Sequence, residues 1–248
     1  MVKILYYLAA FGEPNINTKY DVLIHNINYI YNNLKTHFDL FVNIYDETNF
    51  ESVINKSTFQ YLDNIIISKK TGILSELWIN NTYHECLANY DYIFFILDDV
   101  KIEKLDILTL IKIKKLHNID IISPRVRKST WQYMKGGGGI NNSVTITNRL
   151  EIFCLFLTYI DFEKFISIND IKNPNIWGVD YIFPYYNLKT AICNKYTVEH
   201  VLKSNSDHVK AIEQMDQYIL KHGYDSREDL LEKIPNDIVT IISLDSNI

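Results

Sequence analysis

Two adjacent aspartates, Asp98 and Asp99, directly follow YIFFIL, the most apolar stretch of the chain. Neighbouring carboxylates repel each other, and a carboxylate is unstable in a dry environment unless a positive group pairs with it. The two aspartates therefore either face solvent at the end of a strand or bind a cation. Such oxygen ligands suit Mg²⁺ or Mn²⁺ bridging a diphosphate, and a capping role in the following loop or helix is an equally good interpretation of the motif alone.

Two later segments carry residues that could complete such a site. In NIWGVDYIF, Gly178 permits a tight turn, and Asp180 lies near the start of a predicted short helix. Asp180 could accept a proton from an incoming hydroxyl, or it could simply cap the helix. In YTVEHV, the neutral imidazole of His200 could add a nitrogen ligand to a Mn²⁺ site, although a lone histidine on an apolar strand is usually a core or rim residue.

Alternating strand and helix patterns position these residues. KILYYLAA, DLFVNIYD, NIIISKK, YIFFILDDV and IDIISPRV are predicted strands, and the segments between them that begin at Tyr20, Gly72 and Leu105 show helical spacing of apolar residues. This βαβα order predicts an α/β fold, a single Rossmann-like domain with a mixed, mostly parallel sheet and helices on both faces. In an open parallel sheet, ligands bind beyond the carboxyl ends of the strands, which is where Asp98 and Asp99 are expected.

The pattern changes after Pro124. A long polar loop is followed by the predicted strand LEIFCLFLTYI, a short helix capped by Asp161 and a last strand, TAICNKYTVEHV. The expected organisation is one domain over residues 1–202, with a nucleotide-binding half over about 1–125 and an acceptor-side half over about 126–202. Residues 203–248 are predicted to form a helical extension packed on the same domain, and its end is also consistent with an edge strand.

Composition excludes several classes of protein. The net charge of −5 argues against nucleic-acid binding, and no apolar run approaches the length of a transmembrane segment. Three widely spaced cysteines, Cys86, Cys154 and Cys193, indicate buried, reduced thiols and a cytoplasmic location. The chain has no P-loop, no GxGxxG after its first strand, and no HExxH, CxxC or GxSxG motif.

Taken together and in order, ILDDV, IWGVD and VEHV resemble the motifs of GT-A nucleotide-diphospho-sugar glycosyltransferases over roughly residues 1–202. The resemblance is to small cytosolic or viral members, and a viral source would place the protein in the host cytoplasm. The middle residue of the usual Asp-x-Asp is missing here, so the resemblance does not say which aspartate binds the metal directly. It implies a glycosyltransferase (EC 2.4) that moves a sugar from a nucleoside-diphosphate sugar, UDP-sugar by default, to a hydroxyl of a glycan or other acceptor.

The resemblance also implies roles for individual residues. Asp98, Asp99 and His200 would hold Mn²⁺ or Mg²⁺, and Asp180 would be the general base of an inverting reaction, while a retaining reaction stays open if Asp180 only hydrogen-bonds the acceptor. The nucleotide would contact a set of residues at the ends of the first four strands: Ala9, Ala10, Phe11, Asp46, Lys69 or Lys70, and Asp98.

Two other functions remain open on the sequence. A sugar-nucleotide nucleotidyltransferase needs a glycine-rich, basic loop after the first strand, and FGEPNINTKY fits this poorly. A non-catalytic nucleotide- or sugar-binding module would bind a nucleotide without turnover. The glycines at positions 136–139 are expected to form either a hinged loop that closes over the donor or a flexible connection.

Overall fold

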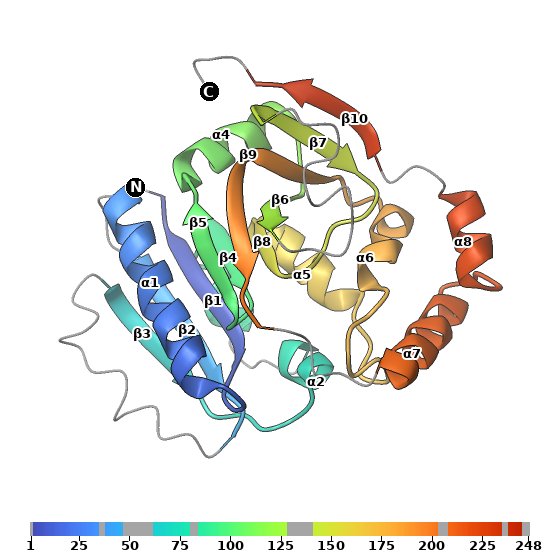
Figure 1. The fold of residues 1–248 in the computed structure, drawn as a ribbon, viewed down its shortest axis with the longest axis horizontal. Helices are drawn as coiled ribbons and strands as arrows, with labels where there is room; N and C mark the ends of the chain where they lie inside the picture. The colour runs from blue at the N-terminus through green and yellow to red at the C-terminus, as the bar shows by residue number, and fades with distance from the viewer. Residues whose placement is uncertain are drawn as a thin grey trace.

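The computed structural model describes residues 2–34, 38–46, 62–79, 84–127, 141–202, 208–234 and 238–244. Within these ranges, ten strands form one mixed sheet in the order β10-β7-β9-β6-β8-β4-β1-β2-β3, and β5 pairs with β9 outside this path. Helices cover both faces of the sheet (Figure 1). The predicted α/β architecture is confirmed, whereas residues 136–139 and the lid hypothesis attached to them lie outside the described ranges.

The first half is the parallel part of the sheet. β1 (Ile4–Phe11), β2 (Phe38–Ile44), β3 (Leu62–Ser68) and β4 (Tyr92–Ile96) run parallel in the order β3-β2-β1-β4. β1, β2 and β4 are buried on both faces, which explains their nearly continuous apolar sequences. Their carboxyl ends lie at one edge of the sheet, and Asp98 and Asp99 come directly after β4.

Helices from different parts of the chain cover the two faces. On one face, Asn26 of α1 (Ile16–Leu34) donates to the hydroxyl of Tyr6 over 3.1 Å. On the other, the ring of Tyr7 packs edge-on against Phe162 of α5 (Tyr159–Ser167), and Trp78 of α2 (Leu74–Ile79) packs against Phe95. Because neighbouring strand residues point to opposite faces, Tyr6 and Tyr7 show that α1 and α5 lie on opposite sides of the sheet.

The second half adds mainly antiparallel pairs. β6 (Ile121–Arg127) runs parallel to β9 (Thr190–His200), while β8 (Cys154–Leu157) pairs antiparallel with both β4 and β6. β7 (Ser143–Thr147) and β5 (Val100–Lys104) also run antiparallel to β9, and the sequence analysis predicted neither of them. Asn26 fixes β5 to α1, because its side chain bonds both the carbonyl of Val100 and the amide of Ile102.

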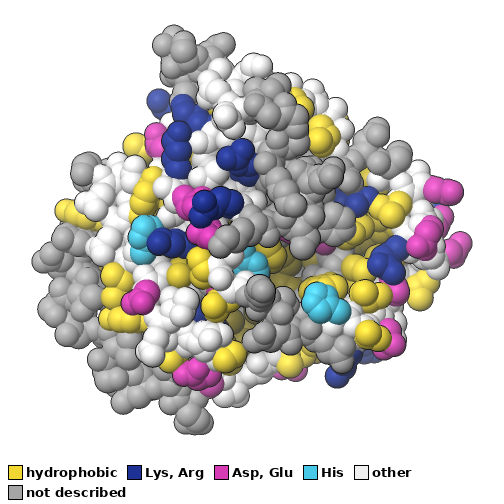
Figure 2. Space-filling view, in the orientation of Figure 1, with side chains coloured by type: hydrophobic (Ala, Val, Ile, Leu, Met, Phe, Trp, Pro, Cys, Tyr) yellow, Lys and Arg dark blue, Asp and Glu magenta, His cyan; other side chains and the backbone are white. Residues whose placement is uncertain are grey.

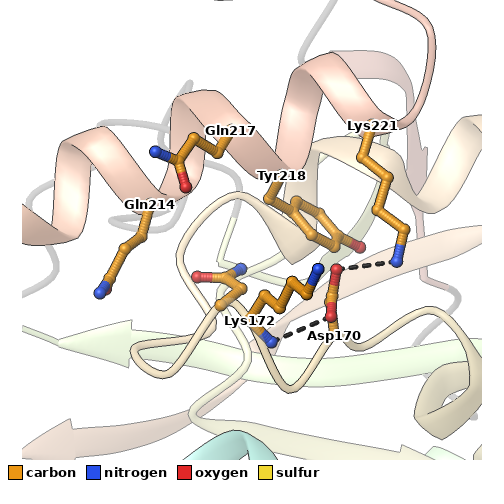
Figure 3. Close-up of a pocket in the computed structure, with 7 residues that line it drawn as sticks. Asp170, Lys172, Gln214, Gln217, Tyr218 and Lys221 are labelled. Carbon is orange, nitrogen blue, oxygen red and sulfur yellow. Dashed lines mark hydrogen bonds and ion pairs between the residues drawn. The ribbon is translucent and has the colours of Figure 1, made fainter.

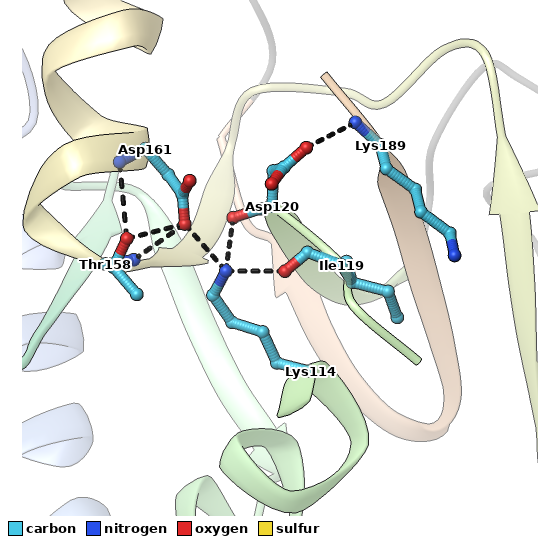
Figure 4. Close-up of polar contacts among 6 residues, drawn as sticks. All are labelled: Lys114, Ile119, Asp120, Thr158, Asp161 and Lys189. Carbon is cyan, nitrogen blue, oxygen red and sulfur yellow. Dashed lines mark hydrogen bonds and ion pairs between the residues drawn. The ribbon is translucent and has the colours of Figure 1, made fainter. Parts of the chain in front are cut away.

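A buried lysine connects α4 (Ile107–Leu116) to the starts of β6 and α5. The ammonium of Lys114 donates to the carbonyls of Ile119 and Asp120 at 2.5 and 2.7 Å, and it forms an ion pair of 2.7 Å with Asp161 (Figure 4). Asp161 also accepts from the amide and the hydroxyl of Thr158. Both charged side chains are more than nine-tenths buried, so this pair is part of the core.

Two local predictions were wrong. Cys86, on α3 (His84–Leu87), is exposed rather than buried. Thr158 rather than Asp161 caps α5, and Asp161 occupies the third position of the resulting capping box. The cap depends on side-chain hydrogen bonds that apolar spacing does not encode. α2 and α3 are the described parts of the helix expected after Gly72, and residues 80–83 between them lie outside the described ranges.

The C-terminal extension contains more than helices. α7 (His208–Lys221) and α8 (Arg227–Lys233) are followed by β10 (Ile238–Ser243), which pairs antiparallel with β7 and lies at the edge of the sheet. The extension predicted as helical therefore consists of two helices and an edge strand, and this strand is the alternative that the sequence left open for its end. In the described ranges, no helix has the length and apolar character that a membrane span requires.

Candidate active site

Asp98 and Lys19 form an ion pair at the carboxyl end of β4. The ammonium of Lys19 lies 2.8 Å from Oδ2 of Asp98 and donates over 2.7 Å to the carbonyl of Gly12, the residue after β1. The exposed fractions of the two side chains are only 9% and 14%. Lys19 therefore provides the positive partner that the sequence analysis considered necessary for a buried carboxylate.

Asp99 and His200 form the second polar pair. Nε2 of His200, at the end of β9, lies 2.8 Å from Oδ2 of Asp99, and the amide of Val201 donates to the carbonyl of Asp99. Burial alone would lower the pKa of His200, but the hydrogen bond and the charge of Asp99 raise it above its ordinary value. The predicted proximity of the aspartate pair to His200 is thus present in the structure.

The segment between β7 and β8 approaches both His200 and the helix that carries Asp180. The ring of Phe153 stacks on His200 with 4.6 Å between centroids, and the negative charge of buried Glu151 contributes to the raised pKa of His200. The guanidinium of Arg149 lies 4.5 Å from the ring centroid of Tyr181, the residue after Asp180. Residues 149–153 therefore bridge the two parts of the candidate site.

Asp180 lies in the first turn of α6 (Val179–Ile182), as predicted, and is half-buried. Gly178, the N-cap of α6, has φ of +86°, and a Cβ there would lie 2.7 Å from Cγ of Met215 on α7. This position therefore requires glycine both for its backbone conformation and for the close approach of α7. A 3-10 helix, η3 (Phe183–Tyr186), follows α6 directly.

The predicted nucleotide-binding residues lie at the ends of β1, β2 and β3. Ala9 and Phe11 are buried in the core and can offer a ligand only their backbone, while Ala10 is half-buried. Oδ2 of Asp46 accepts from the amide of Glu13 over 2.5 Å, and so joins the loop after β1 to the end of β2.

Lys69 and Lys70 follow β3 and differ in exposure. Lys69 is exposed, whereas Lys70 is half-buried. The side chain of Asn43 on β2 bonds both the amide and the carbonyl of Lys70, so the loop after β3 is held to its neighbouring strand.

Two carboxylates and an imidazole are the kinds of ligand that bind Mn²⁺. In the conformation described, Asp98 contacts Lys19 and Asp99 contacts His200, and no three His, Cys, Asp or Glu side chains of the described residues converge on one point. The donor types therefore fit a divalent ion. The ion could bind in two ways. Asp98 would release Lys19 and contact the metal, or Asp99 and His200 would hold the metal without Asp98.

The sequence analysis missed Lys19, Arg149, Glu151 and Phe153. Lys19 lies near the start of α1, where the polar neighbours Asn15 and Asn17 suggest a solvated surface. Glu151 and Phe153 belong to LEIFCLFLTYI, which was predicted as a plain strand, and Arg149 directly precedes it. The one available signal was electrostatic. A buried carboxylate at Asp98 needs a positive partner, but the sequence alone does not say which residue provides it.

The pH dependence of stability provides a test of the Asp98 environment. Burial raises the pKa of Asp98 from 3.8 to about 6; Lys19 opposes this shift and the charge of Asp99 adds to it. Because the folded state binds the proton more tightly than the unfolded state, this contribution to stability is complete below about pH 4 and is lost as the pH rises through about 6. Relative to Asp98→Asn, the free energy of unfolding of the wild type should fall by about 2 kcal/mol between pH ~4 and pH ~6, and by about 3 kcal/mol over the whole titration. Urea denaturation at several pH values measures this difference, and parallel profiles would contradict it.

Comparisons with known proteins agree with the fold but do not identify a family by sequence. No protein-family model matches the sequence, and no curated protein matches it. Among solved structures, S. aureus TarS is similar with a TM-score of 0.55 and 10% identity over 92% of this chain, which spans 45% of that chain. A structure of S. aureus TarS 1–349 in complex with UDP-GlcNAc is similar with a TM-score of 0.55 and 12% identity, covering 94% of this chain and 72% of that one. These similarities support a Rossmann-like α/β fold for this chain, of the kind seen in the TarS structures.

Proposed function

We propose that this chain is a metal-dependent glycosyltransferase that moves a sugar from a UDP-sugar to an acceptor hydroxyl with inversion at the anomeric carbon. The observation that carries the proposal is the pairing of Asp99 with His200, next to Asp98 and Lys19, at the carboxyl end of β4 in a glycosyltransferase fold. Ligands of open α/β sheets bind at this edge. The UDP-GlcNAc complex of the similar TarS structure supports UDP-sugar as the donor class.

The donor would lie across the ends of β1, β2 and β4. Asp46 and the loop after β1 would border the base and ribose, because the Asp46–Glu13 contact fixes that loop. Lys19 would approach the diphosphate, since its ammonium lies between Gly12 and Asp98. A divalent ion held by Asp98, Asp99 and His200 would supply positive charge that stabilises the leaving diphosphate.

The acceptor would approach from the side of α6. Asp180 would take the proton from the attacking hydroxyl, which makes the oxygen a stronger nucleophile. The cation–π contact between Arg149 and Tyr181 joins the segment before β8 to the helix that carries Asp180. Attack opposite the leaving diphosphate gives inversion of configuration.

A nucleotide panel tests the donor site. We expect UDP with Mn²⁺ to raise the melting temperature more than UDP alone, and more than GDP, CDP or dTDP with Mn²⁺, because binding to the folded state stabilises it. Asp99→Ala should lose the Mn²⁺-dependent part of this shift. Asp225→Ala removes an exposed carboxylate after α7 and serves as the matched control. A shift that is equal in wild type and Asp99→Ala would refute the metal assignment, and no shift with any nucleotide would refute the donor site.

Turnover separates the enzyme from a binding module. An enzyme releases UDP from UDP-GlcNAc or another UDP-sugar, with water or a supplied saccharide as the acceptor. A binding module would show the thermal shift without UDP release.

A further inference from the structure

A polar pocket of about 180 Å³ lies between α7 and the loop that follows α5 (Figure 3). Four of its residues, Gln214, Gln217, Tyr218 and Lys221, come from α7, and Asp170 and Lys172 lie on the facing loop. Asn173, from the same loop, completes the lining. The pocket is distinct from the cluster at the end of β4.

The lining has both donors and acceptors of hydrogen bonds. Each side-chain amide of Gln214 and Gln217 offers one carbonyl oxygen and one NH₂ group. Asp170 is already held by Lys221 at 2.8 Å and by the amide of Lys172 at 2.9 Å, so the two ends of the pocket are tied together. Ligands with several hydroxyl groups match such a mixture, because each hydroxyl both donates and accepts.

Asn173 adds a buried acceptor. Only 1% of this residue is exposed, and its Nδ2 donates over 2.8 Å to the carbonyl of Trp177, which fixes the orientation of the amide. Among the described residues, none forms a hydrogen bond with its Oδ1 atom. A buried acceptor without a partner destabilises the fold, and a hydrogen bond from a ligand hydroxyl would remove that penalty.

The pocket is close to the segment that carries Asp180. Burial raises the pKa of the Tyr218 phenol above its ordinary value, and the charges of Tyr186, Asp170 and Asp180 act in the same direction. Asn173 also bonds the backbone of the IWGVD segment through Trp177. A ligand in the pocket would therefore contact residues that position the proposed base.

Aromatic side chains continue from the pocket to the surface. The rings of Tyr185 and Tyr186 pack around His222, which also contacts Tyr218 with 4.6 Å between centroids. Tyr185 is 55% exposed and Tyr186 is 38% exposed. The aromatic rings reach the pocket through His222 and Tyr218, and they offer the apolar surface on which a pyranose ring stacks.

We propose that this pocket binds a neutral hexopyranose unit of the acceptor. The proposal rests on the proposed function for its acceptor role, but the binding of the sugar does not depend on the donor. Asp170 is already paired with Lys221 at 2.8 Å, so most of the hydrogen-bonding groups left in the lining are the neutral amides of Gln214, Gln217 and Asn173. Because an amide both donates and accepts, this set matches the hydroxyl groups of a neutral sugar. The small volume suits one ring rather than a longer chain.

The pocket can be tested by ligand-observed NMR without any nucleotide. Saturation transfer from the protein to the methyl glycosides of glucose, galactose, mannose and N-acetylglucosamine would be recorded in turn at millimolar concentration. We expect at least one glycoside to bind, and Gln217→Ala combined with Lys172→Ala to weaken its binding at least tenfold. Glu213→Ala, an exposed change on α7 outside the pocket, is the matched control and should bind like the wild type.

The outcomes separate this proposal from the proposed function. Sugar binding that is lost in the pocket variant and unaffected by UDP supports the pocket, even if the nucleotide panel fails. The pocket is refuted if no glycoside binds, if the double variant binds like Glu213→Ala, or if inorganic phosphate displaces the sugar from the wild type. In each of these cases, a Mn²⁺-dependent thermal shift with UDP would still support the proposed donor site.

Discussion

Asp180→Asn should lower the rate of sugar transfer about a thousandfold while the affinity for the UDP-sugar stays unchanged. Asn has nearly the same shape as Asp, so the first turn of α6 and the packing of Gly178 on Met215 should be preserved. The amide, however, cannot accept the proton of the attacking hydroxyl. The measurement is UDP release in the presence of saccharide acceptors, together with calorimetric titration of the UDP-sugar.

Two observations control this experiment. Asp225→Asn should retain the wild-type rate, because that residue is exposed and lies outside the site. The anomeric configuration of the first product, observed by NMR, should be inverted relative to the donor. A retained configuration, or an unchanged rate in Asp180→Asn, would show that Asp180 is not the base.

Lys114→Met should lower the free energy of unfolding by about 3–5 kcal/mol. Methionine fills a similar volume, but it leaves the buried carboxylate of Asp161 without its counter-charge and the carbonyls of Ile119 and Asp120 without their donor (Figure 4). The loss should appear as a lower midpoint in urea denaturation followed by circular dichroism.

The control for this change lies one residue away. Lys115 is exposed on the same helix, and Lys115→Met should change stability by less than about 0.5 kcal/mol. Adding Asp161→Asn to Lys114→Met should recover part of the loss, because the neutral amide costs less to bury than an unpaired carboxylate. Equal effects of the two lysine substitutions would show that the buried ion pair does not stabilise the fold.

The parallel strands of the first half were predictable because their burial on both faces imposes a continuous apolar sequence. β1, β2 and β4 are examples. β7 was not predictable in this way, since its sequence, SVTIT, is rich in hydroxyl residues although all five are buried. Asn194 on β9 donates to the hydroxyls of Ser143 and Thr145, and these bonds allow polar residues to occupy a central strand.

The site was predictable in part for a different reason. Asp98, Asp99 and His200 come after strands whose ends were clear from the sequence, so their common edge followed from the topology. Lys19 and Glu151 reach the same place from a helix face and from a connecting segment. The position of such residues depends on how the elements pack, which the spacing along a single segment does not determine.

Lys19 also changes the net charge of the proposed donor site. With both aspartates ionised, the group formed by Lys19, Asp98, Asp99 and His200 carries one net negative charge when the imidazole is neutral, and none when it is protonated. Two bare carboxylates would repel a polyphosphate from a distance, whereas this compensated group does so weakly or not at all. Under the proposed function, Lys19 would act as a resident counter-ion that lets an anionic donor reach the acidic site before any dissolved cation has bound.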